Sequence, residues 1–229
     1  VLLRSSRDQS LNDPDYSGYL HASRGVINSK VSFTKSSKSP TSEYTTYTSS
    51  DLFFYRNKDD SRSTGLSSQV QFEKMLNDKT MLGYFIGGSI GQTKKTASLS
   101  TDALALGLKA GAYFVREVKN NLILDGYASL TQTQNKISLN TDIMNAKASY
   151  YSQTSNVGLN LTGIVPTNTM ELRPKVSLGL IQTQGNEVNF DVTVGSDTSI
   201  EQAIHGAMTR FDVSIAQELR IPLKGSQTF

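Results

Sequence analysis

Apolar side chains recur at every second position over long stretches of this chain, and this period constrains the fold more than any other feature. Between Leu104 and Phe114, every even-numbered residue is apolar, and Phe211, Val213 and Ile215 repeat the pattern further along the chain. A helix would distribute such residues around its axis, whereas a β-strand places them on one face. The sequence therefore predicts long strands with one apolar face and one polar face.

The number of such runs predicts a single all-β domain. Six or seven strands are strongly alternating, and the N-terminal third adds strand composition at Tyr44 to Tyr55, a short run at Lys30 to Thr34 and a weaker strand near Tyr16 to Val26. We expect an antiparallel up-and-down β-barrel of about 10–12 strands over residues 1–229, with 1–15 as a polar lead-in. Whether the barrel is truncated at either end is left open.

The lengths of the connections add a second pattern. Short connections at 77–79, 118–121 and 166–168 alternate with longer polar segments. These longer segments are Gln92 to Thr101, Asn135 to Lys147 and Gln184 to Met208. Outer-membrane barrels have short periplasmic turns at one end and longer external loops at the other. The sequence thus predicts short turns at one end of the barrel and long loops at the opposite end.

Composition excludes several classes of site. The 229-residue chain has no cysteine and two histidines, so it has no thiolate ligands or cysteine nucleophile and little for zinc. The formal net charge is +3 and the basic residues are scattered, so we expect no nucleic-acid partner. The mean hydropathy of −0.34 does not argue against a membrane barrel, because a spanning strand needs only about 9–11 residues with alternate ones apolar.

Charged residues on the polar faces of the expected strands are the candidate functional residues. On a barrel they would face the lumen, where mixed charges hold water or contact a polypeptide; on a soluble sheet they would form an ordinary solvated face. Periodicity alone does not separate these two interpretations. The candidate lumen-facing residues are Lys109, Asp125, Arg173, Lys175, Asp212, Glu218 and Arg220.

No set of residues in the sequence indicates a catalytic site or a metal site. His21 and His205 have serine and aspartate neighbours in sequence, but such neighbours arise by chance in a serine-rich chain, so exposed polar histidines are the favoured interpretation. Asp51, Asp59 and Asp60 lack the alternating oxygen-ligand spacing of a calcium loop. We therefore expect no catalytic residues, no metal and no cofactor.

Three segments carry a resemblance to a known family. Residues Thr64 to Gly88 comprise a glycine-led strand, a short turn and a strand containing Leu82-Gly83; Leu106 to Phe114 is rich in Gly and ends in Tyr-Phe; Leu172 to Leu180 has a Leu-x-Pro-x-x-x-Leu pattern. Together, over roughly Gly65 to Leu223, they resemble the translocator β-domain of bacterial autotransporters.

The resemblance implies a location, a role and partners. The location would be the bacterial outer membrane, and the role would be to anchor there and to assist a passenger segment across it. The implied partners are outer-membrane lipid, a passenger polypeptide and the barrel assembly machinery.

Two other functions fit the same pattern. A secreted or surface-assembled structural protein, such as an adhesin or a filament or sheath subunit, would bury the apolar faces against copies of itself. A small diffusion pore would use the same barrel without a passenger. An enzyme is the least favoured interpretation, because no candidate residues support one.

Overall fold

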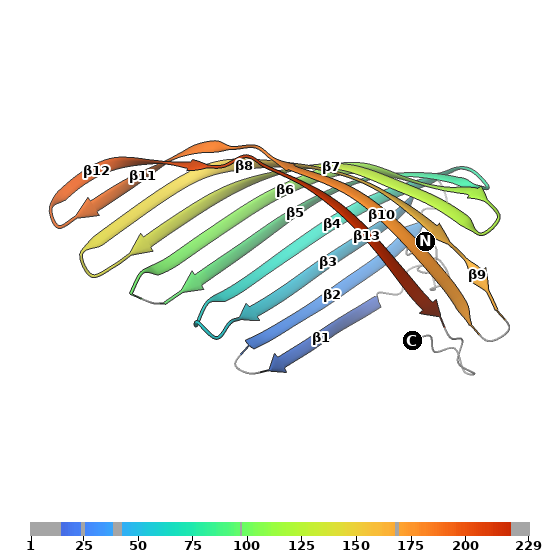
Figure 1. Ribbon diagram of the computed structural model, residues 1–229, viewed down its shortest axis with the longest axis horizontal. Helices are drawn as coiled ribbons and strands as arrows, with labels where there is room; N and C mark the ends of the chain where they lie inside the picture. The colour runs from blue at the N-terminus through green and yellow to red at the C-terminus, as the bar shows by residue number, and fades with distance from the viewer. Residues whose placement is uncertain (1–14, 24–25, 39–42, 97, 168–169, 221–229) are drawn as a thin grey trace.

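A computed structural model describes the chain except for residues 1–14, 24–25, 39–42, 97, 168–169 and 221–229. The described residues form thirteen strands of a single sheet (Figure 1). The strands are β1 (Asp15–Ser23), β2 (Val26–Lys38), β3 (Thr45–Arg56), β4 (Arg62–Asn77), β5 (Thr80–Lys95), β6 (Ser100–Lys119), β7 (Leu122–Asn140), β8 (Met144–Gly163), β9 (Val165–Pro166), β10 (Glu171–Thr183), β11 (Asn186–Val194), β12 (Asp197–His205) and β13 (Met208–Arg220).

The strands follow one another in an up-and-down arrangement. Along the main path the order is β1 to β8, then β10 and β13, and every pairing is antiparallel. The β11–β12 hairpin pairs with the start of β8, and the short β9 pairs with the start of β10. The sheet twists and curls strongly, so that β13 and β10 cross in front of the N-terminal strands in Figure 1. The predicted all-β, antiparallel up-and-down architecture is confirmed.

The weaker N-terminal predictions are confirmed as strands. The strand expected near Tyr16 to Val26 corresponds to β1, the short run at Lys30 to Thr34 lies within the longer β2, and Tyr44 to Tyr55 corresponds to β3. These segments alternate poorly because Ser and Thr occupy many positions, yet both residues are compatible with paired backbone. Among the described residues, no helix is long and apolar enough to cross a membrane.

The prediction of long loops at one end is wrong. β5 continues to Lys95 and β6 begins at Ser100, while β7 continues to Asn140 and β8 begins at Met144. The third segment, Gln184 to Met208, contains the β11–β12 hairpin. These segments are polar, but most of their described backbone is paired strand to strand, and polarity alone does not separate a solvated hairpin from a loop. The end of the sheet that carries the β5–β6, β7–β8 and β11–β12 connections differs from the other end because its strands extend further.

The two strands at the ends of the main path are unpaired on one side. β1 pairs only with β2, and β13 pairs only with β10, within the described residues. Because the path contains ten strands, β1 and β13 run in opposite directions. Pairing β1 with β13 would therefore form one more antiparallel ladder, of the same kind as every other ladder in the sheet.

Candidate functional site

The register separates the sheet into two chemically different faces. Partners such as Ile86 and Ala110, or Leu178 and Val213, lie directly opposite each other on one face. This face is apolar and bare: Ile86 is 60% exposed, Leu108 71% and Ile215 83%. Its apolar run covers 9 residues on β5, from Leu82 to Ile90, and 11 on β6, which matches the roughly 9–11 residues of a membrane-spanning strand.

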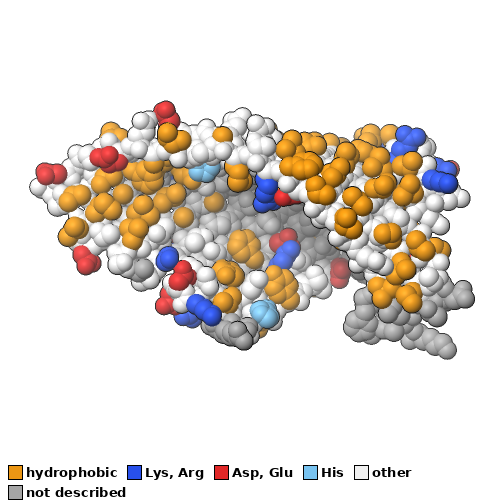
Figure 2. Space-filling model, viewed as in Figure 1, with side chains coloured by type: hydrophobic (Ala, Val, Ile, Leu, Met, Phe, Trp, Pro, Cys, Tyr) orange, Lys and Arg blue, Asp and Glu red, His pale blue; other side chains and the backbone are white. Residues whose placement is uncertain are grey.

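The other face lines a hollow. A cavity of about 520 Å³ is bounded on one side by Gln69 and Gln71 of β4 and on the other by Lys175 of β10 and Ala216 of β13. Residues from strands far apart in the sheet thus share one cavity, so the polar face is the concave one. Figure 2 shows the molecule hollowed, with charged side chains of both signs around the hollow and hydrophobic side chains spread over the strands that cross in front of it.

The residues expected to face a lumen share the concave face, although some lie outside the cavity. Arg173 lies directly opposite Glu218 in the β10–β13 register, and Asp212 lies opposite Gly179. Asp212 is not in the cavity wall and forms an ion pair with Arg210 at 2.9 Å. The side chain of Arg220 lies outside the described residues. The expected residues that line the cavity are Lys109, Asp125, Arg173, Lys175 and Glu218. Their role in a lumen stays a prediction, since the sheet is open.

Local contacts orient these charges within the cavity. The Lys109 ammonium lies over the Phe85 ring, 5.1 Å from its centroid. Asp125 accepts a hydrogen bond of 2.6 Å from the Asn160 amide, and Arg173 forms an ion pair with Glu171. The walls therefore offer both cations and anions at defined positions.

A buried polar pair beside the cavity is not apparent from the sequence. The Tyr113 hydroxyl donates a hydrogen bond of 2.6 Å to the Glu73 carboxylate, and Glu73 is only 2% exposed. Tyr113 also covers Gly83, its register partner on β5. The alternation places all three residues on the polar face, but only the strand register brings β4, β5 and β6 together here.

The histidines and Asp51 contact different parts of the sheet, and His205 is half-buried rather than exposed as the sequence predicts. His21 lies exposed on the edge strand β1, and the His205 ring lies 5.6 Å from the Tyr150 ring. Asp51 accepts a hydrogen bond from Ser32 at 2.6 Å and pairs with Lys30 at 3.1 Å. The part of the chain that the structure describes contains no group of three or more His, Cys, Asp or Glu residues arranged to hold a metal ion.

A sequence model of the autotransporter β-domain matches residues 53–202, which is more than half of the chain. The chain belongs to the autotransporter β-domain family. This autotransporter β-domain is therefore an outer-membrane β-barrel protein of bacteria, as the resemblance implied, and its bare apolar face has the composition expected of a lipid-facing surface. Curated protein sequences provide no match.

Solved structures share the fold at low identity. The ferric yersiniabactin uptake receptor FyuA from Yersinia pestis aligns over 95% of this chain and 41% of its own, with 8% identity and a TM-score of 0.52. The ferric citrate transporter FecA aligns over 91% of this chain and 35% of its own, with 7% identity and a TM-score of 0.53. The autotransporter β-domain thus spans less than half the length of these chains, and the likeness concerns the strand arrangement alone.

Proposed function

We propose that this autotransporter β-domain anchors in the outer membrane and assists a passenger segment across it, without catalysing a reaction. The observation that carries the proposal is the concave cavity, whose walls hold charges of both signs while the opposite face carries an apolar run of membrane-spanning length. Its insertion would depend on the barrel assembly machinery. Family membership favours this role over a secreted filament or sheath subunit.

The physical mechanism requires little chemistry. Once the β1 and β13 edges are joined, every strand of the main path has a neighbour on both sides, so its backbone groups find partners within the sheet rather than facing lipid. The concave face then encloses a polar space. An extended passenger exposes its own backbone groups and side chains of either charge, and Lys109, Asp125 and Lys175 offer partners of both signs while water fills the remaining volume.

The cavity can be filled to test the role in passage. The full chain is expressed with an export signal and a reporter passenger, and display is measured by protease accessibility on intact cells. Replacing Gln71 and Lys175 by Trp places two bulky side chains on opposite walls of the cavity, and we expect display to fall. The matched control places Trp at Val70 and Val176, the adjacent positions that face lipid.

Correct insertion must be checked for both pairs of variants, by heat-modifiable migration on gels. Reduced display in the cavity pair, with normal insertion in both pairs, is the expected result. Unchanged display in the cavity pair would contradict passage through this space. Steady ionic conductance of the wild-type protein in planar bilayers, combined with unchanged display, would favour a diffusion pore instead.

A further inference from the structure

Three cationic side chains lie next to one another on the lipid-facing surface. Arg56 of β3 is directly opposite Arg62 of β4, and Arg62 is directly opposite Lys94 of β5. The register places all three on the same face as Leu66 and Ile90, which face lipid. Like charges directly opposite each other destabilise a sheet unless an anion lies close to them.

The depth of this basic row matches a lipid headgroup layer. Arg56 lies two residues beyond Phe54, while Arg62 and Lys94 each lie four residues beyond the last apolar residue of their strands, Leu66 and Ile90. With a rise of about 3.3 Å per residue and a tilt of about 45°, the row lies roughly 5–10 Å beyond the apolar belt. The polar interfacial layer of a bilayer occupies about this depth.

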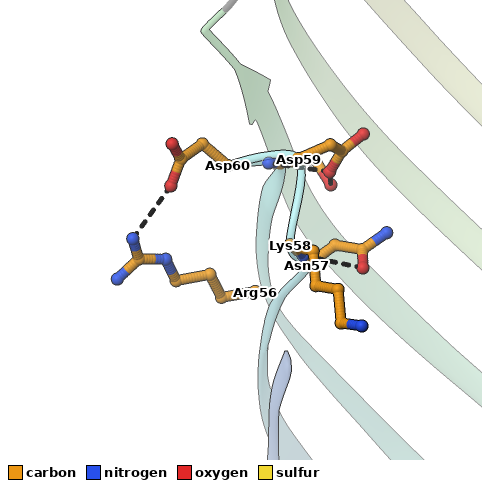
Figure 3. Close-up of polar contacts among 6 residues, drawn as sticks. Arg56, Asn57, Lys58, Asp59 and Asp60 are labelled. Atoms are coloured by element: carbon orange, nitrogen blue, oxygen red, sulfur yellow. Dashed lines mark hydrogen bonds and ion pairs between the residues drawn. The ribbon is translucent and has the colours of Figure 1, made fainter. Parts of the chain in front are cut away.

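The protein's own carboxylates leave the centre of the row uncompensated. Arg56 pairs with Asp60 at 2.8 Å, and Lys94 pairs with Asp102 at 3.3 Å. Arg62, between them, has no ion pair among the described residues. Figure 3 shows the β3–β4 turn, where Asp60 reaches Arg56 on one side of the strand and Asp59 turns to the other side.

An apolar hollow lies directly below the row on the same surface. It has a volume of about 640 Å³ and its wall includes Leu66, Gly88, Ile90 and Leu108. Gly88 provides an open floor: a Cβ at this position would have no atom nearer than 3.7 Å. The row of cations and the hollow together fit an amphiphile with an anionic head above and an acyl chain below.

We propose that Arg56, Arg62 and Lys94 bind a phosphate of a phosphorylated, multiply acylated glycolipid of the outer leaflet, with one acyl chain in the hollow over Gly88. A guanidinium group binds phosphate with two parallel hydrogen bonds to two oxygens, which favours phosphate over other headgroup chemistry. The row lies at the end opposite the two-residue β4–β5 and β6–β7 turns, and because short turns mark the periplasmic end of outer-membrane barrels, the row lies at the external end. The site is independent of passenger translocation and requires only the outer-membrane location.

The test measures lipid affinity of the full chain by native mass spectrometry in detergent. The probes are bisphosphorylated lipid A, enzymatically dephosphorylated lipid A and phosphatidylglycerol. We expect Arg62→Gln to weaken binding of the bisphosphorylated form roughly fivefold, and a triple substitution to Gln at positions 56, 62 and 94 to weaken it about a hundredfold. The matched control is Lys95→Gln, which removes a cation from the next residue of β5 on the opposite face.

A second variant tests the acyl chain. Gly88→Phe fills the hollow and is expected to weaken binding of both forms of lipid A, while Arg62→Gln weakens only the phosphorylated form. Heat-modifiable migration verifies that each variant is folded. The proposal is overturned if Arg62→Gln binds bisphosphorylated lipid A as tightly as the wild type, or if dephosphorylated lipid A or phosphatidylglycerol binds as tightly as the bisphosphorylated form.

Discussion

At the scale of single residues, aromatic rings of the concave face lie flat over glycines of neighbouring strands. The Tyr113 ring would be 2.2 Å from a Cβ at Gly83, and the Tyr127 ring would be 2.4 Å from one at Gly158. Any larger residue at these glycines must displace a ring. Because glycine has no side chain, the ring can lie against the backbone of the neighbouring strand. This close contact lets the sheet curve tightly while the cavity wall stays packed.

Substitution at Gly83 is therefore expected to destabilise the sheet. Gly83→Ala forces the Tyr113 ring away and disturbs its hydrogen bond to Glu73, so we expect a loss of about 1–3 kcal/mol in the free energy of unfolding. Gly91→Ala is the control on the same strand and face, because the nearest atom to its Cβ would be 3.8 Å away. Urea unfolding in lipid vesicles measures both; equal loss in the two variants would contradict the ring contact as the cause.

The β3–β4 turn contains a carboxylate with a strongly lowered pKa. Hydrogen bonds from the Ser61 hydroxyl and from Lys95 lower the pKa of Asp59 to about 2. Because the folded pKa lies below the ordinary value, these contacts stabilise the turn above about pH 4 and are lost as the pH falls through about 2.

This shift can be measured directly. We expect the carboxyl carbon of Asp59 to titrate in NMR spectra with a midpoint about 2, and Ser61→Ala to move that midpoint upward toward the ordinary value. An unchanged midpoint in the Ser61 variant would rule out the hydroxyl as the main cause.

At the scale of elements, the polarity of the long strands inverts along their length. On β7 the lipid-facing side carries Leu124 and Leu130 and then Lys136, while the concave side carries Asp125 and then Ile137. An apolar exterior suits lipid, and a polar exterior with apolar residues inside suits water. We therefore expect the inversion to mark where the strands leave the membrane, with the extended ends of β7 and β8 outside it.

The absence of tryptophan from the chain makes this boundary measurable. A single Trp at position 130 should be quenched strongly by lipids brominated on their acyl chains, whereas a Trp at position 136 should not, because it lies outside the hydrocarbon layer. A Trp at position 131, at the depth of Leu130 but on the concave face, is the control for depth without lipid contact. Equal quenching at 130 and 136 would contradict the assigned boundary.

At the scale of the whole molecule, the unpaired edges of β1 and β13 decide whether the sheet is a barrel. An open edge in lipid leaves backbone groups without partners at a cost of several kcal/mol each. The even number of strands along the main path, ten, gives the two edges opposite directions, which suits antiparallel closure. We expect the edges to pair within one chain in the membrane.

Cysteine pairs on this cysteine-free chain can detect closure. Tyr19→Cys on the concave side of β1 should form an intramolecular disulfide with a cysteine at one of the β13 positions 212, 214 or 216. Leu20→Cys, whose side chain faces lipid, should not form one with the same partners. Disulfide-linked dimers in place of the intramolecular product would show that the edges join copies of the chain instead.

The sequence predicts much of the fold and part of the site. Alternation alone assigns Lys109 and Asp125 to the face opposite Leu108 and Leu124, because side chains on a strand have only two directions. It does not predict the contact between Tyr113 and Glu73, since these residues lie on different strands and their proximity depends on the register. The sequence also does not separate the polar hairpin ends from loops, because Ser, Thr and Asn occur in both.

Sequence by itself thus determined the strands, the two faces and the family, all of which depend on local period and on residue order. Tertiary structure alone decided the cavity, the aromatic–glycine contacts and the basic row of Arg56, Arg62 and Lys94. These features join residues from different strands, and the register that aligns the strands comes from backbone pairing across the sheet rather than from any local pattern.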